Sequence, residues 1–387
     1  MNRYRLDKIF DLQMGKTPAR AKADYWNDGS NNWVSIADMS TYSKYVGTTK
    51  ETITDSGVEE SGIRAVPPNT VILSFKLSLG KVAITTDPIY TNEAIMAFLD
   101  KGVVAIYSDY IYYLFSSMDW AKGTNKAVKG TTLNKATLSA FEIVVPDFPK
   151  QRKIAAILDA ASGLIAERKR QIEQLDILVK SRFVEMFGEP ETNPMGWDKT
   201  TIGDSCHYVK DGPHVSPDYV EDGTGVPFIS TRNLVGRHGI DWSTAKYISE
   251  DDYEMYIRKC NPEKGDILYT KGGTTGIACY VDTEICFANW VHVAVLKFGG
   301  QLDGIYFENM LNSDYCYRQS QMLTKGIANR DLVLSAIKQI VFYLPPLPLQ
   351  EKFADFVRQV DKSKFEIQQG LEKLELQYNA LMQRYFG

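Results

Sequence analysis

The sequence predicts an α+β protein in which two mixed α/β domains alternate with two long helices. The first observation is an internal repeat, because residues 141–188 and 340–387 align without a gap at a constant shift of 199, from Gly188 to Gly387. The second is that each copy runs 39 residues without proline and carries apolar residues at helical spacing. The third is that glycine-rich segments with short strand-like runs precede both copies. A period this long indicates two half-molecules rather than a solenoid.

The first domain is expected over residues 1–145. Alternating and continuous apolar runs predict its strands, and one apolar segment predicts a helix from Tyr107 to Met118. The strand-like runs lie at 32–39, 69–75, 80–86 and 94–99. A segment of lysine, glycine, threonine and asparagine after residue 121 predicts a basic loop before the last strand.

The long helices are expected over residues 146–188 and 345–387. Prolines open both segments, where a missing N–H does not weaken the first turn of a helix. Each helix would be roughly 58 Å long, and one small domain cannot bury so long an apolar stripe. We therefore expect the two helices to pack against each other as an antiparallel coiled coil with a pseudo-twofold axis.

The second domain is expected over residues 189–344, and its sequence resembles that of the first. The best match pairs Ser74 with Thr270 and Gly80 with Gly276 at a shift of 196. The matched segments are 70–84 with 266–280, 129–134 with 325–330, and 34–39 with 228–233. The two domains are therefore expected to share one fold.

Composition is that of an ordinary globular protein, with 44% hydrophobic residues, 24% charged residues and a net charge of −4. This charge gives no whole-chain argument for nucleic-acid binding, so any basic surface must be local. The five cysteines follow residue 200 without a C-x-x-C pair, which favours reduced thiols and a cytoplasmic protein. No export signal and no run of 18 apolar residues is present, so no membrane partner is expected.

A known family shares this order of block, helix, block and helix. The residues that carry the resemblance are Leu344-Pro-Pro-Leu-Pro-Leu-Gln350, its copy Val145-Pro-Asp-Phe-Pro-Lys-Gln151, and the Phe-Gly ends of both helices. Gly15-Lys-Thr-Pro18 and the Lys129-Gly-Thr-Thr-Leu-Asn134 segment add to it. In these features the chain resembles the specificity subunit of type I restriction-modification systems. The first copy departs from the pattern at Asp147-Phe148, and the second block has Gly212-Pro-His214 where the first has Gly15-Lys-Thr17.

The resemblance implies a non-catalytic DNA-recognition subunit. Each block would be a target-recognition domain for one half of a bipartite site in double-stranded DNA. The helices would set the gap between the half-sites and dock two adenine methyltransferase subunits. Restriction subunits would join through the complex, and the chain itself would need no cofactor.

Motifs for other chemistry are incomplete. Gly15-Lys16-Thr17 lacks the first glycine of a P-loop, because Phe10 stands there. No Asn/Asp-Pro-Pro-aromatic segment is present to hold a flipped adenine, and the four histidines lack metal spacing. The segment Gly272–Gly276 could cradle a phosphate, but a glycine-rich hairpin explains it more simply.

DNA contact requires lysine, arginine, serine and threonine for phosphates, and arginine, lysine, asparagine or glutamine for base edges. Residues of these types lie on glycine-rich segments of both blocks. In the first block they are Lys16, Thr17, Lys76, Ser78, Lys81, Lys122, Asn125, Lys126, Lys129, Thr131, Thr132 and Asn134. In the second they are Lys210, Arg232, Asn233, Lys271, Thr274, Thr275, Lys325, Asn329 and Arg330. For any single residue a solvated surface charge is the simpler interpretation, whereas the clusters at 122–135 and 325–330 favour DNA. Trp26, Trp33, Trp197 and Trp242 fit a core better than base stacking.

The sequence leaves two alternatives open. The chain could be a free-standing DNA-binding or coiled-coil scaffold protein that uses its helices only to dimerise. It could also be an enzyme of a type without a sequence signature. Methylation by the purified chain alone would favour the enzyme, and an adjacent methyltransferase gene would favour the specificity subunit.

Overall fold

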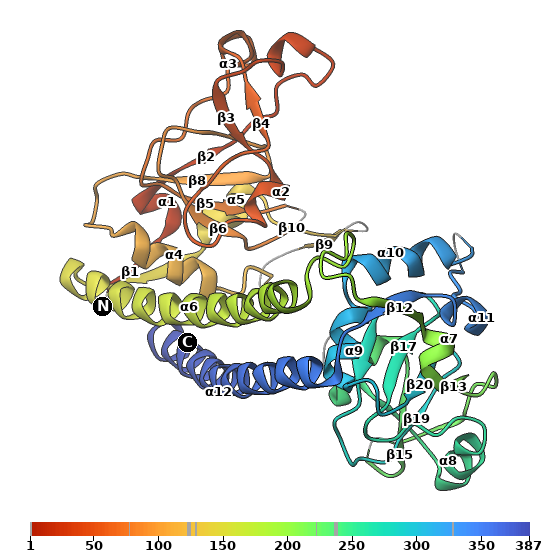
Figure 1. The fold of residues 1–387 in the computed structure, drawn as a ribbon. Helices are drawn as coiled ribbons and strands as arrows, with labels where there is room; N and C mark the ends of the chain where they lie inside the picture. Colours follow the sequence, from red (N-terminus) through yellow and green to blue (C-terminus); the bar gives the residue numbers. More distant parts are fainter. Residues whose placement is uncertain are drawn as a thin grey trace. The chain divides into compact units, whose positions relative to one another are not determined.

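The computed structural model describes residues 2–76, 78–121, 125–127, 130–221, 223–235, 239–326 and 329–387 (Figure 1). The chain forms two compact units. The first unit contains Met1–Lys169 and Gln369–Gly387, and the second contains Arg170–Gln368. Each unit therefore combines one mixed α/β block with parts of both long helices.

The first unit is built around an antiparallel sheet of order β2-β8-β5-β6, accompanied by a second sheet of order β4-β3-β7 and two separate strand pairs, β1-β11 and β9-β10. The strands are β1 (Asn2–Arg5), β2 (Phe10–Met14), β3 (Asn31–Val34), β4 (Glu51–Ile53), β5 (Val71–Ser74), β6 (Val82–Ile84), β7 (Tyr90–Thr91), β8 (Ile95–Asp100), β9 (Asn125–Ala127), β10 (Gly130–Thr132) and β11 (Glu142–Val145). The helices are α1 (Leu6–Ile9), η1 (Ala23–Tyr25), α2 (Ile36–Met39), α3 (Asp55–Ser61), α4 (Ser108–Ser117) and α5 (Lys135–Ala140).

The central sheet of this unit is buried on both faces. On one face Val71 and Leu73 of β5 join a cluster with Tyr110 and Phe115 of α4. On the other face Ile72 packs in a second cluster with Val34 of β3 and Met39 of α2. A strand covered on both sides is expected to be apolar at every position, which explains the continuous run Val71–Leu73.

The second unit repeats this plan with a sheet of order β13-β20-β17-β18, beside a sheet of order β14-β16-β15-β19 and the pair β12-β21. Its strands are β12 (Asp198–Thr201), β13 (Cys206–Asp211), β14 (Tyr219–Val220), β15 (Val226–Ile229), β16 (Lys246–Ile248), β17 (Ile267–Thr270), β18 (Ala278–Tyr280), β19 (Ala288–Asn289), β20 (Val293–Phe298) and β21 (Val341–Leu344). Its short helices are α7 (Ile202–Ser205), η2 (Thr231–Asn233), η3 (Trp242–Thr244), α8 (Glu250–Ile257), α9 (Gly304–Leu311), α10 (Asp314–Leu323) and α11 (Leu334–Ile337).

Sequence predictions of individual elements are confirmed for α4 and for the strands at β5, β6 and β8. The run 32–39 is corrected, because only β3 is a strand and the chain then turns into α2. Ser35 and Asp38 cause this change through a capping box, in which the Ser35 hydroxyl accepts from the Asp38 N–H and the Asp38 carboxylate accepts from the Ser35 N–H. Ser230 and Asn233 form the same box in the second unit.

The two long helices are α6 (Phe148–Phe187) and α12 (Leu347–Phe386), each of 40 residues. In the first unit the early residues of α6 pack in one cluster with Tyr378, Leu381 and Phe386, late in α12. In the second unit Phe183 and Phe187, late in α6, contact Phe353, early in α12. Within the described residues no helix is long and apolar enough to span a membrane.

Each long helix begins with a buried glutamine that binds its own block. The Gln151 amide donates to the carbonyls of Pro146 at 2.8 Å and Ala105 at 2.9 Å, and its oxygen accepts from the Tyr107 N–H at 2.8 Å. Gln350 repeats all three bonds with Pro345, Gln301 and Asp303. Both glutamines are 0% exposed, which explains why this residue is identical in the two copies.

Candidate nucleic-acid interface

The turns that follow β5 in the first central sheet and β17 in the second have the same backbone hydrogen bonds. In the first unit Gly80 N–H donates to the Ser74 carbonyl at 2.9 Å, and the Ser74 hydroxyl accepts from the Lys81 N–H. In the second unit Gly276 and Thr270 make the same two bonds, the second one with Ile277. Gly80 and Gly276 have φ values of +86° and +89°, in the left-handed region that favours glycine. The predicted pairing at a shift of 196 is therefore confirmed here.

This turn also settles the two interpretations of Gly272–Gly276. Strands β17 and β18 pair antiparallel on either side of it, so the segment is a hairpin turn. Three of its N–H groups are already used, since Gly272 donates to His292, Gly273 to Arg330 and Gly276 to Thr270. The turn consequently offers few free donors for a phosphate, and the hairpin interpretation is the correct one.

One pairing predicted from sequence is corrected. The sequence pairs residues 129–134 with 325–330, which predicts that Asn134 corresponds to Arg330. In the structure Leu133 N–H donates to the Phe75 carbonyl, and the same bond is made by Leu332 to Lys271. Leu133 therefore corresponds to Leu332, and the match shifts by three residues because the loop lengths differ.

In the first block, the predicted contact residues outside the basic segment lie at the ends of the strands. Lys16, Ser78 and Lys81 are exposed, whereas Thr17 and Lys76 are half-buried. Lys16 donates to the Ser61 carbonyl, and the Thr17 hydroxyl accepts from Asn92 at 3.0 Å and donates to Glu93. A DNA phosphate would have to compete with these internal partners.

The basic segment of the first block lies partly outside the described residues. Lys122 and Lys129 are among the residues that are not described. Asn125 and Lys126 lie on β9, Thr131 and Thr132 lie on β10, and the two strands form an antiparallel hairpin. Asn134 follows this hairpin as the N-cap of α5, where its side-chain oxygen accepts from the Thr137 N–H at 2.8 Å. Its side chain is exposed, and the cap occupies only its oxygen.

In the second block, three predicted contact residues are buried and have internal roles. Lys271 is 6% exposed, and its ammonium lies 3.1 Å from Asp331 and 3.6 Å from Asp211. Thr275 is 2% exposed and bonds Thr324, and Asn233 is 2% exposed in its capping box. Because these three side chains are buried, they are not positioned to contact a DNA duplex directly.

The remaining predicted residues of this block are accessible. Lys210, Arg232, Thr274, Lys325 and Asn329 are exposed, and Arg330 is half-buried. The Arg330 guanidinium is held by Gln321 and lies 3.5 Å from the Thr275 hydroxyl. Arg330 is thus a positioned cation beside the hairpin turn, a geometry suited to reading a base edge or a phosphate.

Sequence reasoning missed two groups of residues that attach the long helices to their blocks. The buried glutamines Gln151 and Gln350 could have been found, since they are among the identical positions of the repeat. The ion pairs of Lys44 with Asp109 and Asp159 had no sequence signal, because these residues are far apart in the chain.

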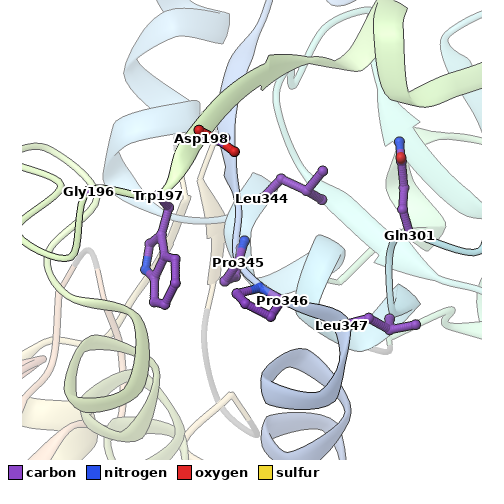
Figure 2. Close-up of a pocket in the computed structure, with 8 residues that line it drawn as sticks. All are labelled: Gly196, Trp197, Asp198, Gln301, Leu344, Pro345, Pro346 and Leu347. Carbon is purple, nitrogen blue, oxygen red and sulfur yellow. The ribbon is translucent and has the colours of Figure 1, made fainter.

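A pocket of about 370 Å³ lies at the start of α12 and is shown in Figure 2. The Trp197 ring stands beside the Pro345-Pro346 turn, and Gln301 and Leu347 lie on its other side. The Trp197 indole N–H donates to the Phe187 carbonyl at 2.9 Å, so this ring also caps the end of α6. Among the described residues that line this pocket, Asp198 is the one with an ionisable side chain.

Four of the five cysteines are buried. Burial raises the pKa of Cys206 to about 12 and of Cys260 to about 11, so both thiols stay protonated at neutral pH. Within the described residues no three histidine, cysteine or acidic side chains are grouped to bind a metal ion. The neighbours Cys206 and His207 lie on β13 with the cysteine buried and the histidine exposed, as strand alternation predicts.

The chain is similar to known proteins over most of its length. The family described as "Type I restriction modification DNA specificity domain" matches residues 1–175 and 194–376. The chain is 26% identical over 374 residues to the Type I restriction enzyme MjaIX specificity subunit of Methanocaldococcus jannaschii, covering 92% of this chain and 85% of that protein. It is 29% identical over 198 residues to the EcoR124I/EcoR124II specificity subunit of Escherichia coli, covering 46% of each chain.

Solved structures share the fold. The S subunit of a type I restriction-modification system from M. genitalium superposes with a TM-score of 0.61 at 16% identity, covering 100% of this chain and 96% of that one. A chain from a study of complex assembly in the type I system gives a TM-score of 0.58 at 15% identity, covering 100% and 97%. With the family match covering both blocks and most of both long helices, this chain belongs to the type I restriction-modification DNA specificity family.

Proposed function

We propose that this chain selects the DNA sequence on which a type I methyltransferase and endonuclease complex acts. Each block is a target-recognition domain for one half of a bipartite site in double-stranded DNA. The observation that carries the proposal is the duplication of one hairpin-turn design, with Gly80 in one block and Gly276 in the other, each beside polar side chains. Two copies of one reading surface suit two half-sites.

The proposed contact surface keeps the residues predicted from the sequence, apart from the three that are buried in the second block. In the first block it comprises Lys16, Thr17, Lys76, Ser78, Lys81, Lys122, Asn125, Lys126, Lys129, Thr131, Thr132 and Asn134. In the second block it comprises Lys210, Arg232, Thr274, Lys325, Asn329 and Arg330. Lysines would bind phosphates, whereas Asn134, Asn329 and Arg330 are the candidates for base edges.

The long helices are proposed to form an antiparallel coiled coil that sets the gap between the half-sites, with a pseudo-twofold relation between the halves. Support comes from ion pairs between the helices within each unit. Lys169 of α6 lies 2.8 Å from Glu375 of α12 in the first unit, and Lys364 lies 2.8 Å from both carboxylate oxygens of Asp176 in the second. From Lys169 to Asp176 of α6 the partner on α12 moves back from Glu375 to Lys364, as antiparallel helices require.

Partners are proposed on the same grounds. Two adenine methyltransferase subunits would dock on the helices, and restriction subunits would join through the complex. The net charge of −4 limits the phosphate contacts that this chain can provide, so the methyltransferases must supply many of them. The chain itself is proposed to carry out no chemical step.

Methylation of a plasmid library with randomised half-sites and variable gaps tests this proposal. The chain reconstituted with its methyltransferase subunits should methylate adenines in one bipartite sequence with half-site centres about 10 bp apart. Gel shifts should show tight binding by the complex and weak binding by the chain alone. Equal affinity with and without the methyltransferase, or methylation by the chain alone, would contradict the assignment.

A further inference from the structure

Among the described residues, helix α6 is attached to the first block by the apolar packing of Ile154, Ala155 and Leu158 and by two separate groups of polar contacts. Gln151 makes the first attachment through its three buried hydrogen bonds. Asp159 makes the second, eight residues or about 12 Å farther along the helix. A helix held at one point can pivot, whereas two separated points also fix its direction relative to the block.

The second attachment is centred on Lys44. Its ammonium forms ion pairs with Asp109 of α4 and Asp159 of α6, and its side chain is only 13% exposed. The Tyr113 hydroxyl donates to the same Asp159 oxygen at 2.6 Å, and the Tyr45 hydroxyl donates to Asp109 at 2.7 Å. The cluster therefore joins a loop, α4 and α6 through charged and phenolic groups.

The backbone around Lys44 is itself fixed. Ile84 of β6 donates its N–H to the Lys44 carbonyl at 2.9 Å, and the Val46 N–H donates to the Ile84 carbonyl at 2.9 Å. The ammonium thus projects from a segment bonded to the central sheet. Any rotation of α6 against the sheet would have to break the ion pair with Asp159.

The second unit has a weaker contact at the corresponding place. The residue 199 positions after Asp159 is Arg358, whose guanidinium lies 3.7 Å from Asp303 and 2.7 Å from Asp355 on its own helix. The Arg358 side chain is 55% exposed, and water competes with such a pair. Among the described residues, Gln350 is therefore the principal polar attachment of α12 to its block, beside the apolar packing of Phe353 and Val357.

We infer that Lys44 and Asp159 are positioning residues that fix the angle between the first recognition domain and its spacer helix, and so restrict the gap length that the protein accepts. The inference rests on the proposed function. The Lys44 cluster of the first unit would thus limit the range of gap lengths that the protein accepts. Its counterpart in the second unit, Arg358 with Asp303, is exposed. Neither residue needs to touch DNA.

The test compares Asp159→Ala and Lys44→Met with the matched control Arg358→Ala, at the equivalent position of the other helix. Asp159→Ala leaves Lys44 paired with Asp109, so folding should survive even where Lys44→Met fails to fold. Each full-length variant is reconstituted with methyltransferase subunits and assayed on plasmids with the preferred half-sites and gaps of varying length. Circular dichroism and thermal unfolding establish that each variant is folded.

On sites whose gap differs by one base pair from the preferred length, the methylation rate is expressed relative to the rate at the preferred gap. Asp159→Ala should raise this ratio roughly fivefold, the factor that corresponds to losing one partly exposed ion pair. The half-site bases should stay unchanged, Arg358→Ala should match the wild type, and Lys44→Arg should retain the wild-type gap. A folded Asp159→Ala with the wild-type gap profile, or an equal effect of Arg358→Ala, would overturn the inference. A wild type without any fixed gap would refute the proposed function itself.

Discussion

The side-chain oxygen of Gln350 accepts a hydrogen bond from the backbone N–H of Asp303 at 3.0 Å, while its amide donates to the carbonyls of Pro345 and Gln301. One fully buried side chain thus satisfies three backbone groups where α12 leaves its block. Since Gln151 makes the same set of bonds for α6, this residue type connects both long helices to their blocks.

Replacing Gln350 with leucine should reduce the unfolding free energy by about 3 kcal/mol, because buried backbone groups lose their partners. Urea unfolding of the full chain measures the change. The control is Gln359→Leu, an exposed glutamine on the same helix, which should change stability by less than about 0.5 kcal/mol. Equal effects of the two substitutions would show that the buried bonds contribute little.

Lengthening both spacer helices should lengthen the accepted DNA gap. Four residues inserted between Gln174 and Leu175, matched by four between Gln368 and Gln369, add about one helical turn or ~6 Å. At ~3.4 Å per base pair the gap should grow by one or two base pairs while the half-site bases stay the same. An insertion in α6 alone is the control, and it should disturb the pairing of Lys169 with Glu375 or of Lys364 with Asp176. A changed half-site sequence with a fixed gap would contradict this division of roles.

Two roles of Asn134 can be separated by substitution. Asn134→Ala should destabilise the first unit by about 1 kcal/mol through loss of the α5 cap, whereas Asn134→Ser keeps a capping oxygen and should remain as stable as the wild type. If the exposed amide reads a base, both variants should relax sequence choice at the first half-site only. Thermal unfolding measures the stability, and methylation of half-site libraries measures the sequence preference. If Asn134→Ser kept the wild-type preference at the first half-site, the role of Asn134 would be capping alone.

Lys126 and Lys129 are expected to bind phosphates without reading sequence. Replacing both with alanine should weaken binding by the methyltransferase complex to all sites. The slope of log K against log salt should become less steep by about 2, since each phosphate contact contributes roughly 0.9. Fluorescence anisotropy at several salt concentrations measures the slope, with Lys50→Ala as a control lysine from another part of the block. A loss confined to one half-site sequence would indicate base contact instead.

The Lys44 cluster should make the free energy of unfolding depend on pH in the acidic range. Burial alone would raise the pKa of Asp109, but hydrogen bonds from Lys44 and Tyr45 outweigh it and hold this pKa below its ordinary value. A carboxylate with a lowered folded-state pKa stabilises the protein fully above its unfolded pKa of about 3.9 and loses this effect as pH falls through the folded value.

Asp109→Asn should therefore be less stable than the wild type at neutral pH by about 3 kcal/mol, because it breaks a largely buried ion pair. The difference should shrink as pH falls below about 4. Urea unfolding across this range measures it, with the exposed Asp11→Asn as control. A difference that stayed constant at all pH values would show that packing, rather than charge, is responsible.

The repeat, the two long helices and the central strands could be predicted from the sequence, because each depends on local patterns. Prolines, a 39-residue stretch without them, and apolar periodicity identified α6 and α12 to within a few residues. The pairing of Gly80 with Gly276 was visible because a left-handed turn demands the same residue in both blocks. Family membership followed from the order of these parts.

Only the tertiary structure decided which candidate side chains are accessible. Lys271 has the same residue type as Lys325, but neighbouring strands and loops bury it between Asp211 and Asp331, while Lys325 stays exposed. The link from Lys44 to Asp159 likewise joins residues 115 positions apart. Burial and ion pairing are properties of residues brought together by the whole fold, and a local sequence pattern carries no information about such distant partners.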